Sequence, residues 1–145
     1  MSKFDSNLSA PDTTPPTVSS TDPASDAVNV NINSVVTATF DEAMKPDSIT
    51  IGSVFTVSGI TGTVTYDPVT MTATFTPSGN LSDSTTYTAT ITTGVMDLSG
   101  NAMAADYTWS FATVDTTQPT VSSTSPANGA TGVAINSIIT ATFSE

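Results

Sequence analysis

The chain contains the same sequence twice, and this repeat limits what it can fold into. The run Asp-Thr-Thr-Pro-Pro-Thr-Val-Ser-Ser-Thr, which begins at Asp12, returns at Asp115 as Asp-Thr-Thr-Gln-Pro-Thr-Val-Ser-Ser-Thr. The match continues without a gap to residue 145, and about two thirds of the paired positions are identical. A period of this size corresponds to a whole domain, because solenoid repeats are only about 20–50 residues long. The repeat therefore predicts a complete module at residues 12–114 and the start of a second one.

The parts outside the complete module have separate expectations. Residues 1–11 are predicted to be a linker or disordered tail, and residues 115–145 to be the truncated first two strands of a second module of identical type. A segment of about 31 residues is too short to bury a core of its own. It is therefore expected to be disordered or loosely packed, or to replace the matching strands in another copy of the chain as a domain swap.

The charge balance excludes several classes of partner. Thirteen acidic residues stand against two basic ones, and the net charge is −11. Nucleic acid is excluded because phosphate binding needs many basic side chains, and the same shortage disfavours anionic membrane surfaces. No apolar run approaches the ~18 residues of a membrane span, so no membrane insertion is expected. The N-terminus does not have the pattern of a secretion signal, so a signal for export would lie outside this sequence.

Alternating apolar residues predict an all-β fold. In Val35–Phe40, Val36, Ala38 and Phe40 share one face, the period-2 pattern of a half-buried strand. Other strands are predicted between turn signals at Thr17–Thr21, Val28–Ile32, Ser48–Ile51, Phe55–Ser58, Thr63–Tyr66, Thr72–Thr76, Tyr87–Thr92 and Tyr107–Thr113. Seven to nine short strands in about 100 residues indicate an antiparallel Greek-key β-sandwich.

Aromatic residues on the later strands are predicted to be structural. Leu81 stands six residues before Tyr87, a spacing that suits a tyrosine corner, in which the phenol bonds to upstream backbone. Trp109 and Phe111 alternate with polar residues on the last predicted strand, which indicates core positions together with Phe40. The alternative for the last strand is a sugar-stacking stripe that includes Tyr107.

A set of segments in a fixed order carries a family resemblance. The segments are Thr39–Met44 with Pro46–Ile49, Val64–Asp67, Thr74–Pro77, Leu81–Tyr87, Val95–Asn101 and Trp109–Phe111. Together they resemble the bacterial Ig-like domains of the S-layer type. The resemblance implies an Ig-like sandwich found in tandem in secreted or surface-anchored bacterial proteins. There it serves as a spacer, an S-layer part or an accessory domain beside adhesins and polysaccharide-acting enzymes.

Catalysis has little support in the composition. Histidine, cysteine and arginine are all absent, so the usual general base, thiolate nucleophile and anion clamp are missing. The pair Asp41-Glu42 suggests a glycosidase, but adjacent residues at a strand end point to opposite faces, whereas glycosidase carboxyls must converge on one bond. The chain is therefore predicted not to be an enzyme.

Calcium is the cofactor that the oxygen-bearing residues suggest, although the default expectation is no cofactor. Asp97, Ser99 and Asn101 offer a carboxylate, a hydroxyl and an amide around a glycine, which resembles half of a calcium loop. The other interpretation is a plain Asx turn between the last two strands. Asp115 is a second candidate, at the junction between modules, where calcium would stiffen an array.

Two functions remain open. The first is a structural spacer whose partners are the neighbouring Ig-like repeats of the same extracellular or cell-surface polypeptide, kept from sticking by acidic surfaces. The second is an adhesive or carbohydrate-binding module that acts through loops at one end of the sandwich.

Overall fold

The structure is a computed structural model that describes residues 10–144. It consists of two compact units, one up to Asp115 and one from Thr116. Most of the predicted linker at residues 1–11 lies outside the described residues. None of the described helices has the length and hydropathy that crossing a bilayer requires.

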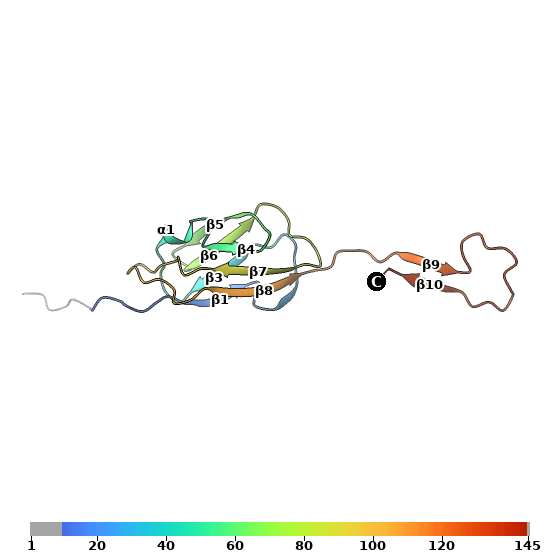
Figure 1. The fold of residues 1–145 in the computed structure, drawn as a ribbon, viewed down its shortest axis with the longest axis horizontal. Helices are drawn as coiled ribbons and strands as arrows, with labels where there is room; N and C mark the ends of the chain where they lie inside the picture. Colours follow the sequence, from blue (N-terminus) through green and yellow to red (C-terminus); the bar gives the residue numbers. More distant parts are fainter. Residues whose placement is uncertain (1–9, 145) are drawn as a thin grey trace, which may run out of the picture. The chain divides into compact units, whose positions relative to one another are not determined.

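The first unit is a β-sandwich of two four-stranded sheets, and Figure 1 shows its strands from blue to orange. One sheet has the order β1-β3-β6-β5 and the other the order β2-β8-β7-β4. The elements are β1 (Val18–Asp22), β2 (Ala27–Val30), β3 (Val36–Phe40), α1 (Pro46–Ile49), β4 (Phe55–Val57), β5 (Gly62–Asp67), β6 (Thr72–Pro77), β7 (Thr86–Ile91) and β8 (Tyr107–Thr113). The predicted all-β sandwich is confirmed, with one difference in detail. The pairing of β2 with β8 is parallel, whereas the other pairs are antiparallel.

The core lies between the two sheets and is formed by alternate residues of their strands. In β3 the side chains of Val36, Ala38 and Phe40 are buried, as the alternation predicts. The rings of Phe55 in β4 and Phe75 in β6 pack across the layers with centroids 5.8 Å apart. Such contacts between large apolar groups are the main source of stability for a domain of this size.

The strand predicted at Ser48–Ile51 is wrong. The segment begins with the helical turn α1, which has Pro46 at its start and Asp47 in its first turn. Proline has a fixed φ that suits the first turn of a helix, and a carboxylate is favourable near a helix N-terminus. Ser48 and Ile49 are both buried, so the apolar residue that suggested a strand instead anchors the turn.

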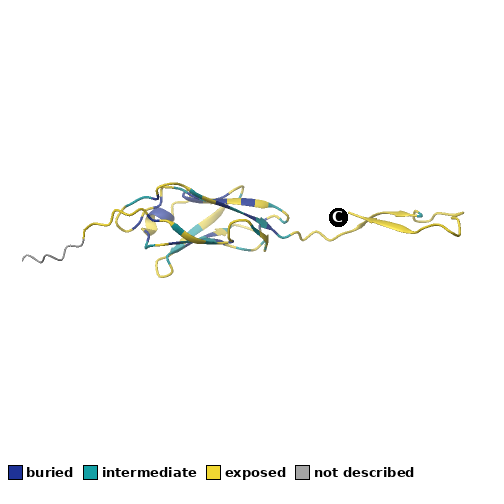
Figure 2. Ribbon diagram, turned by 90° about the horizontal axis from the view of Figure 1, so that it is seen from below, coloured by how far each residue is buried: buried dark blue, intermediate teal, exposed yellow. Residues whose placement is uncertain are grey.

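The second unit is a single hairpin of β9 (Val121–Ser125) and β10 (Thr140–Phe143). All residues of both strands are exposed, and Figure 2 shows this as continuous yellow, in contrast to the buried positions of the first unit. Residues 116–144 therefore have local order without a core of their own.

Tyr87 and Leu81 together fix the crossover before β7. The phenol oxygen of Tyr87 accepts a hydrogen bond of 2.9 Å from the backbone N–H of Ser82, and the Leu81 N–H donates to the carbonyl of Ile32 at 2.7 Å. Both side chains are buried, at 5% exposure for Tyr87 and 2% for Leu81. This is the geometry of a tyrosine corner.

Removing the hydroxyl with Tyr87→Phe should lower the free energy of unfolding by about 1–2 kcal/mol, because the Ser82 N–H loses its acceptor. Chemical denaturation followed by fluorescence measures the change. Tyr107→Phe is the matched control, since the described residues supply no hydrogen-bond partner for that hydroxyl, and it should change stability by less than about 0.5 kcal/mol. Equal losses in the two variants would contradict a specific role for the Tyr87 hydroxyl.

Candidate functional site

The four predicted calcium candidates do not lie together. Asp97, Ser99 and Asn101 belong to the loop that connects β7 to β8. Asp115 follows the far end of β8, which runs seven residues from Tyr107 to Thr113. At about 3.3 Å per residue, the strand places Asp115 roughly 20 Å from the loop. The junction candidate at Asp115 is thus a separate place from the Asp97 loop, and calcium at either place stays a prediction.

The loop is organised around the carboxylate of Asp97, which is 1% exposed. One carboxylate oxygen accepts from the Asn101 backbone N–H at 2.8 Å, and the other accepts from the Asn101 side-chain amide at 2.7 Å. The Gly100 N–H donates to the Asp97 carbonyl at 3.2 Å. Gly100 has φ +93°, a conformation that glycine adopts readily. The Asp97 carboxylate thus stabilises the loop through hydrogen bonds within it, as the Asx-turn interpretation predicts.

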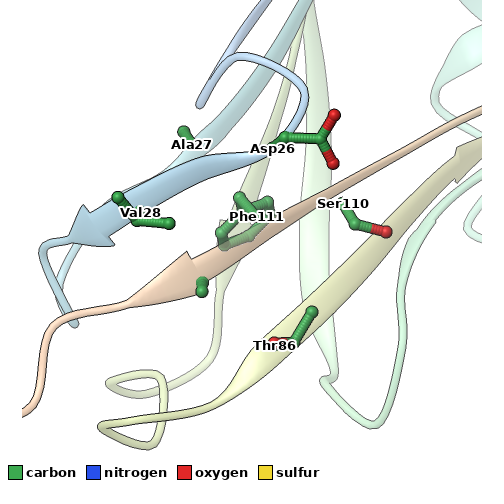
Figure 3. A pocket seen from close by; sticks show the side chains of 7 residues that line it. Asp26, Ala27, Val28, Thr86, Ser110 and Phe111 are labelled. Carbon is green, nitrogen blue, oxygen red and sulfur yellow. The ribbon is translucent and has the colours of Figure 1, made fainter.

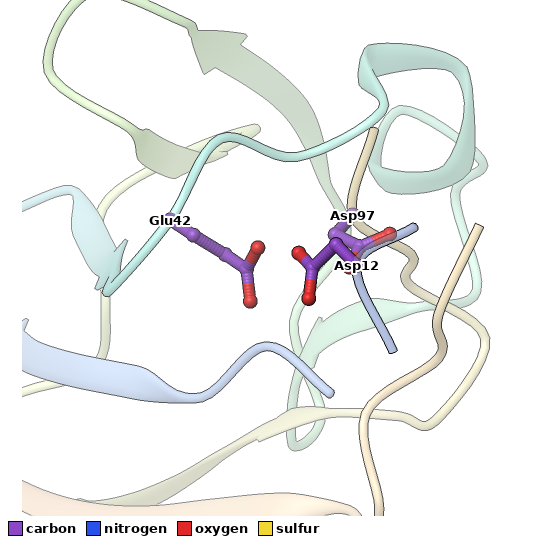
Figure 4. A group of neighbouring side chains, drawn as sticks. All are labelled: Asp12, Glu42 and Asp97. Carbon is purple, nitrogen blue, oxygen red and sulfur yellow. The ribbon is translucent and has the colours of Figure 1, made fainter. Parts of the chain in front are cut away.

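Two further carboxylates meet Asp97 at this end of the module. Asp12 comes from the segment before β1, and Glu42 is the second residue after the end of β3. Figure 4 shows the carboxylates of Glu42 and Asp12 facing each other with Asp97 beside Asp12, and ligand oxygens of the three residues lie within 4.8 Å of one another. The amide of Asn101 also donates to the Asp12 carbonyl at 3.2 Å, which ties the leading segment to the loop.

Sequence reasoning missed Asp12 and Glu42 as members of this cluster. They lie 30 residues apart in the sequence, and Asp97 is a further 55 residues away, so no local motif joins them. A signal existed in the repeat, because both acids recur in the second copy as Asp115 and Glu145. Asp115 therefore corresponds to Asp12, which approaches the Asp97–Asn101 loop of the first module.

The pKa values of these groups shift in opposite directions. Burial raises the pKa of Glu42 above its ordinary value of 4.5, and the negative charges of Asp12, Asp97 and Asp41 add to this. Burial alone would raise the pKa of Asp97, but hydrogen bonds from Asn101, Gly100 and Ser99 outweigh it and lower the pKa below 3.8. The pKa of Asp41 is also lowered, chiefly by the Thr17 backbone N–H.

These shifts predict a stability optimum at mildly acidic pH. A folded-state pKa raised above the unfolded value adds stability as pH falls through it, so protonation of Glu42 should raise the melting temperature between neutral pH and 4.5. Lowered values act in the reverse sense, so the contribution of Asp97 should be lost as pH falls below 3.8. Calorimetry across this range measures both limbs.

Two variants test which residue causes each part of this pH dependence. Glu42→Gln should reduce the rise in melting temperature between neutral pH and 4.5, and Asp97→Asn should reduce the fall in melting temperature below pH 3.8. A melting temperature that falls steadily from neutral pH downward in the unaltered chain would contradict the predicted optimum.

Asp41 has a structural role. Its carboxylate accepts from the backbone N–H of Thr17 at 2.8 Å and from the Thr17 hydroxyl at 2.7 Å. These bonds hold the start of β1 against the end of β3. Asp41 thus joins two strands, while its neighbour Glu42 belongs to the carboxylate cluster with Asp12 and Asp97.

Two hollows on the first unit are small. One lies beside β2 and β8, has a volume of about 190 Å³ and is lined by Val28 and Ala112 among others (Figure 3). Another of about 280 Å³ lies beside Val18 and Tyr107. Both are below the ~300–1,000 Å³ typical of small-molecule sites.

The aromatic residues of β8 are used inside the sandwich. Trp109 is 3% exposed and Phe111 is 1% exposed, and the Trp109 indole N–H donates to the Pro23 carbonyl at 3.0 Å. Neither ring can offer a face to a sugar, so the stacking stripe considered for the last strand does not form.

Comparisons with known proteins agree with this architecture. A family model described as "Bacterial Ig-like domain" matches residues 12–113 and again residues 115–145. No curated protein gives a significant match. Among solved structures, that of the S-layer protein rSbsC(31-844) matches with 22% identity and a TM-score of 0.51, covering 74% of this chain and 15% of that one. The N-terminal part of the bacterial S-layer protein SbsC matches with 22% identity and a TM-score of 0.52, covering 74% of this chain and 25% of that one. The chain therefore spans a quarter or less of these two structures.

Proposed function

Because the chain belongs to the bacterial Ig-like domain family, we propose that residues 12–114 form a non-catalytic spacer module of an extracellular or cell-surface multidomain protein. Its partners are the neighbouring Ig-like repeats of the same polypeptide. The repeat supports this proposal, since a second match to the same family follows the first after a single residue.

One observation carries the spacer proposal: the chain reaches the module at one end and leaves it at the other. The start of β1 pairs with the end of β3, beside the loop that precedes β8. The exit follows the opposite end of β8, where the Val114 N–H donates to the Val30 carbonyl at 2.8 Å. Each module added in series therefore contributes its own length to the polypeptide.

Labelling the full chain at its two module ends tests this role. Because the sequence has no cysteine, Thr14→Cys and Val114→Cys give two unique sites for a fluorescent pair. A spacer should hold one narrow distance distribution between the labels at any salt concentration and in the presence of soluble glycans. A broad distribution, or one that changes with glycan, would contradict the spacer role.

A titration distinguishes the alternative function. An adhesive or carbohydrate-binding module should show glycan-dependent NMR shift changes confined to loops at one end of the sandwich. A spacer should show none at millimolar glycan. The small volumes of the hollows favour the spacer.

The spacer role needs no cofactor, and the ligand that the carboxylate cluster suits best is a structural calcium ion. Asp12, Glu42 and Asp97 supply the hard oxygen atoms that calcium prefers. A cation among them would relieve the repulsion by neighbouring aspartates that adds to the effect of burial on the pKa of Glu42. It would also fasten the leading segment, which carries Asp12, to the module.

We therefore expect calcium to raise the melting temperature. For a dissociation constant near 1 mM, as in extracellular modules, 10 mM calcium should raise it by roughly 5–10 °C. Glu42→Gln should remove most of this rise, and magnesium at the same concentration controls for ionic strength. An unchanged melting temperature with calcium would exclude the ion while leaving the spacer role intact.

A further inference from the structure

The first unit holds the chain before its first strand begins. The side-chain amide of Asn101 donates to the Asp12 carbonyl at 3.2 Å. Pro16 is buried. The N–H and the hydroxyl of Thr17 both donate to the Asp41 carboxylate, at 2.8 Å and 2.7 Å. The segment is therefore fixed to the module at both of its ends, although β1 starts only after it. We call residues 12–17 the leading strap.

The backbone of the leading strap has little freedom between these two ends. Pro15 and Pro16 each have a fixed φ, and a proline also restricts the residue before it, which here includes Thr14. The Thr14 N–H donates to the Asp12 carboxylate at 2.9 Å. The strap therefore has a defined conformation and belongs to the module.

The other end of the module holds the chain as far as Val114. The Val114 N–H donates to the Val30 carbonyl at 2.8 Å, and the Val114 carbonyl accepts from the Ser84 N–H at 3.0 Å. Val114 lies one residue beyond the end of β8. Because its N–H and its carbonyl are both bonded to other segments, the chain leaves the module only after this residue.

The repeat makes these two fixed points neighbours in the sequence. Asp115 is the counterpart of Asp12, and it follows Val114 directly. The segment that one module holds therefore ends where the leading strap of the next module begins.

The second copy keeps the part of the strap contact that lies within its described residues. The Thr120 N–H donates to the Ser144 hydroxyl at 3.1 Å, and these residues occupy the positions of Thr17 and Asp41. A serine thus accepts the same backbone bond in place of the aspartate. The leading strap is therefore a recurring part of the module and not a feature of one copy.

Building on the spacer role, we propose that successive modules are joined without a free linker residue, so that bending is confined to the connection between Val114 and the Asp12 position of the next module. Relative motion is the usual expectation for linked domains, and linker residues permit it. Here each module fixes the chain on its own side of the joint. A spacer built in this way resists bending at every joint.

Backbone dynamics of the full chain test the hold on the leading strap. The amide order parameters of Thr13 and Thr14 should be about 0.85, the value of rigid backbone. Asn101→Ala removes the bond to Asp12 and should lower both to below about 0.6, while Thr17, which Asp41 holds, keeps its value. Measuring ¹⁵N relaxation gives these values.

Asn80→Ala is the matched control, because this exposed asparagine precedes β7 at the other end of the module. It should leave the order parameters of Thr13 and Thr14 unchanged. Order parameters below about 0.6 at these two residues in the unaltered chain would show a free linker and would overturn the proposal.

A chain with two complete modules tests the joint itself. Residues 1–114 are followed by residues 12–145, so the natural chain gains one complete module. Thr56→Cys in both complete modules gives two sites for spin labels, since Thr56 is exposed in β4 and the sequence has no cysteine. Pulsed electron paramagnetic resonance should give one narrow distance distribution between the labels.

Inserting Gly-Ser-Gly-Ser between the two modules is the comparison. Four such residues add a flexible span of roughly 10–12 Å and should roughly double the width of the distribution. Equal widths with and without the insertion would show that the natural joint is already flexible and would overturn the proposal. The glycan titration that tests the spacer role is independent of this result, so the two proposals can fail separately.

Discussion

Replacing Phe40 with alanine should lower the free energy of unfolding by about 3–5 kcal/mol, the usual range for a large aromatic residue removed from a core. Phe40 is 1% exposed, and its ring and that of Tyr66 pack in an edge-to-face arrangement with centroids 6.5 Å apart. A loss of this size is a large part of the total stability of a single domain. Urea denaturation followed by Trp109 fluorescence measures it, since Trp109 is the single tryptophan and is buried.

The repeat supplies an internal control for this prediction. Phe143 is the same residue at the same position of the second copy, but it is 58% exposed. Phe143→Ala should therefore alter the unfolding of the module by less than about 0.5 kcal/mol. Comparable losses in both variants would mean that the exposed face of the hairpin is covered in solution.

Replacing Gly62 with alanine should destabilise the module by about 3 kcal/mol, at the upper end of the range for adding atoms to a packed site. A Cβ atom there would come within 2.5 Å of the Thr76 carbonyl oxygen and of the Phe75 ring. The ring belongs to the core and the carbonyl to the neighbouring strand β6. Neither can move without disturbing the β5–β6 pairing, in which Gly62 stands opposite Pro77.

Gly79→Ala is the matched control, because a Cβ atom at Gly79 meets nothing within 4 Å. It should be neutral or slightly stabilising, since alanine restricts the unfolded chain more than glycine does. Thermal unfolding of the two variants in parallel makes the comparison. Similar melting temperatures for Gly62→Ala and Gly79→Ala would show that β5 can shift away from Phe75.

Strand positions with a strong alternation could be predicted from the sequence, and those set by distant contacts could not. The face of Val36, Ala38 and Phe40 follows from period 2 alone, because the sheet buries every second residue. From the sequence, Gly62 indicates a turn. Only the position of the Phe75 ring, on the neighbouring strand β6, explains why a glycine stands in β5.

The candidate site was less predictable for the same reason. The bonding within Asp97–Asn101 is local, and the motif indicates it. The approach of Asp12 and Glu42 depends on how the leading segment and the end of β3 meet the β7–β8 loop, which no short motif encodes. The helical turn at Pro46 was missed because Ile49 is apolar in either structure, and the helix-starting proline was the signal that should have decided between them.

The parallel pairing of β2 with β8 has a mechanical consequence. The contact runs from the Asp26 N–H, which donates to Ser110 at 2.7 Å, to the Val114 N–H, which donates to Val30 at 2.8 Å. Tension from the N-terminal side passes through β1 and its pairing with β3 before it reaches the first residue of β2, and tension from the C-terminal side reaches β8 at its last residue. The two strands are then drawn past each other lengthwise, with the hydrogen bonds across the pair in shear. These bonds bear the load together and do not open one at a time from an end. The β2–β8 pair therefore resists stretching of the polypeptide.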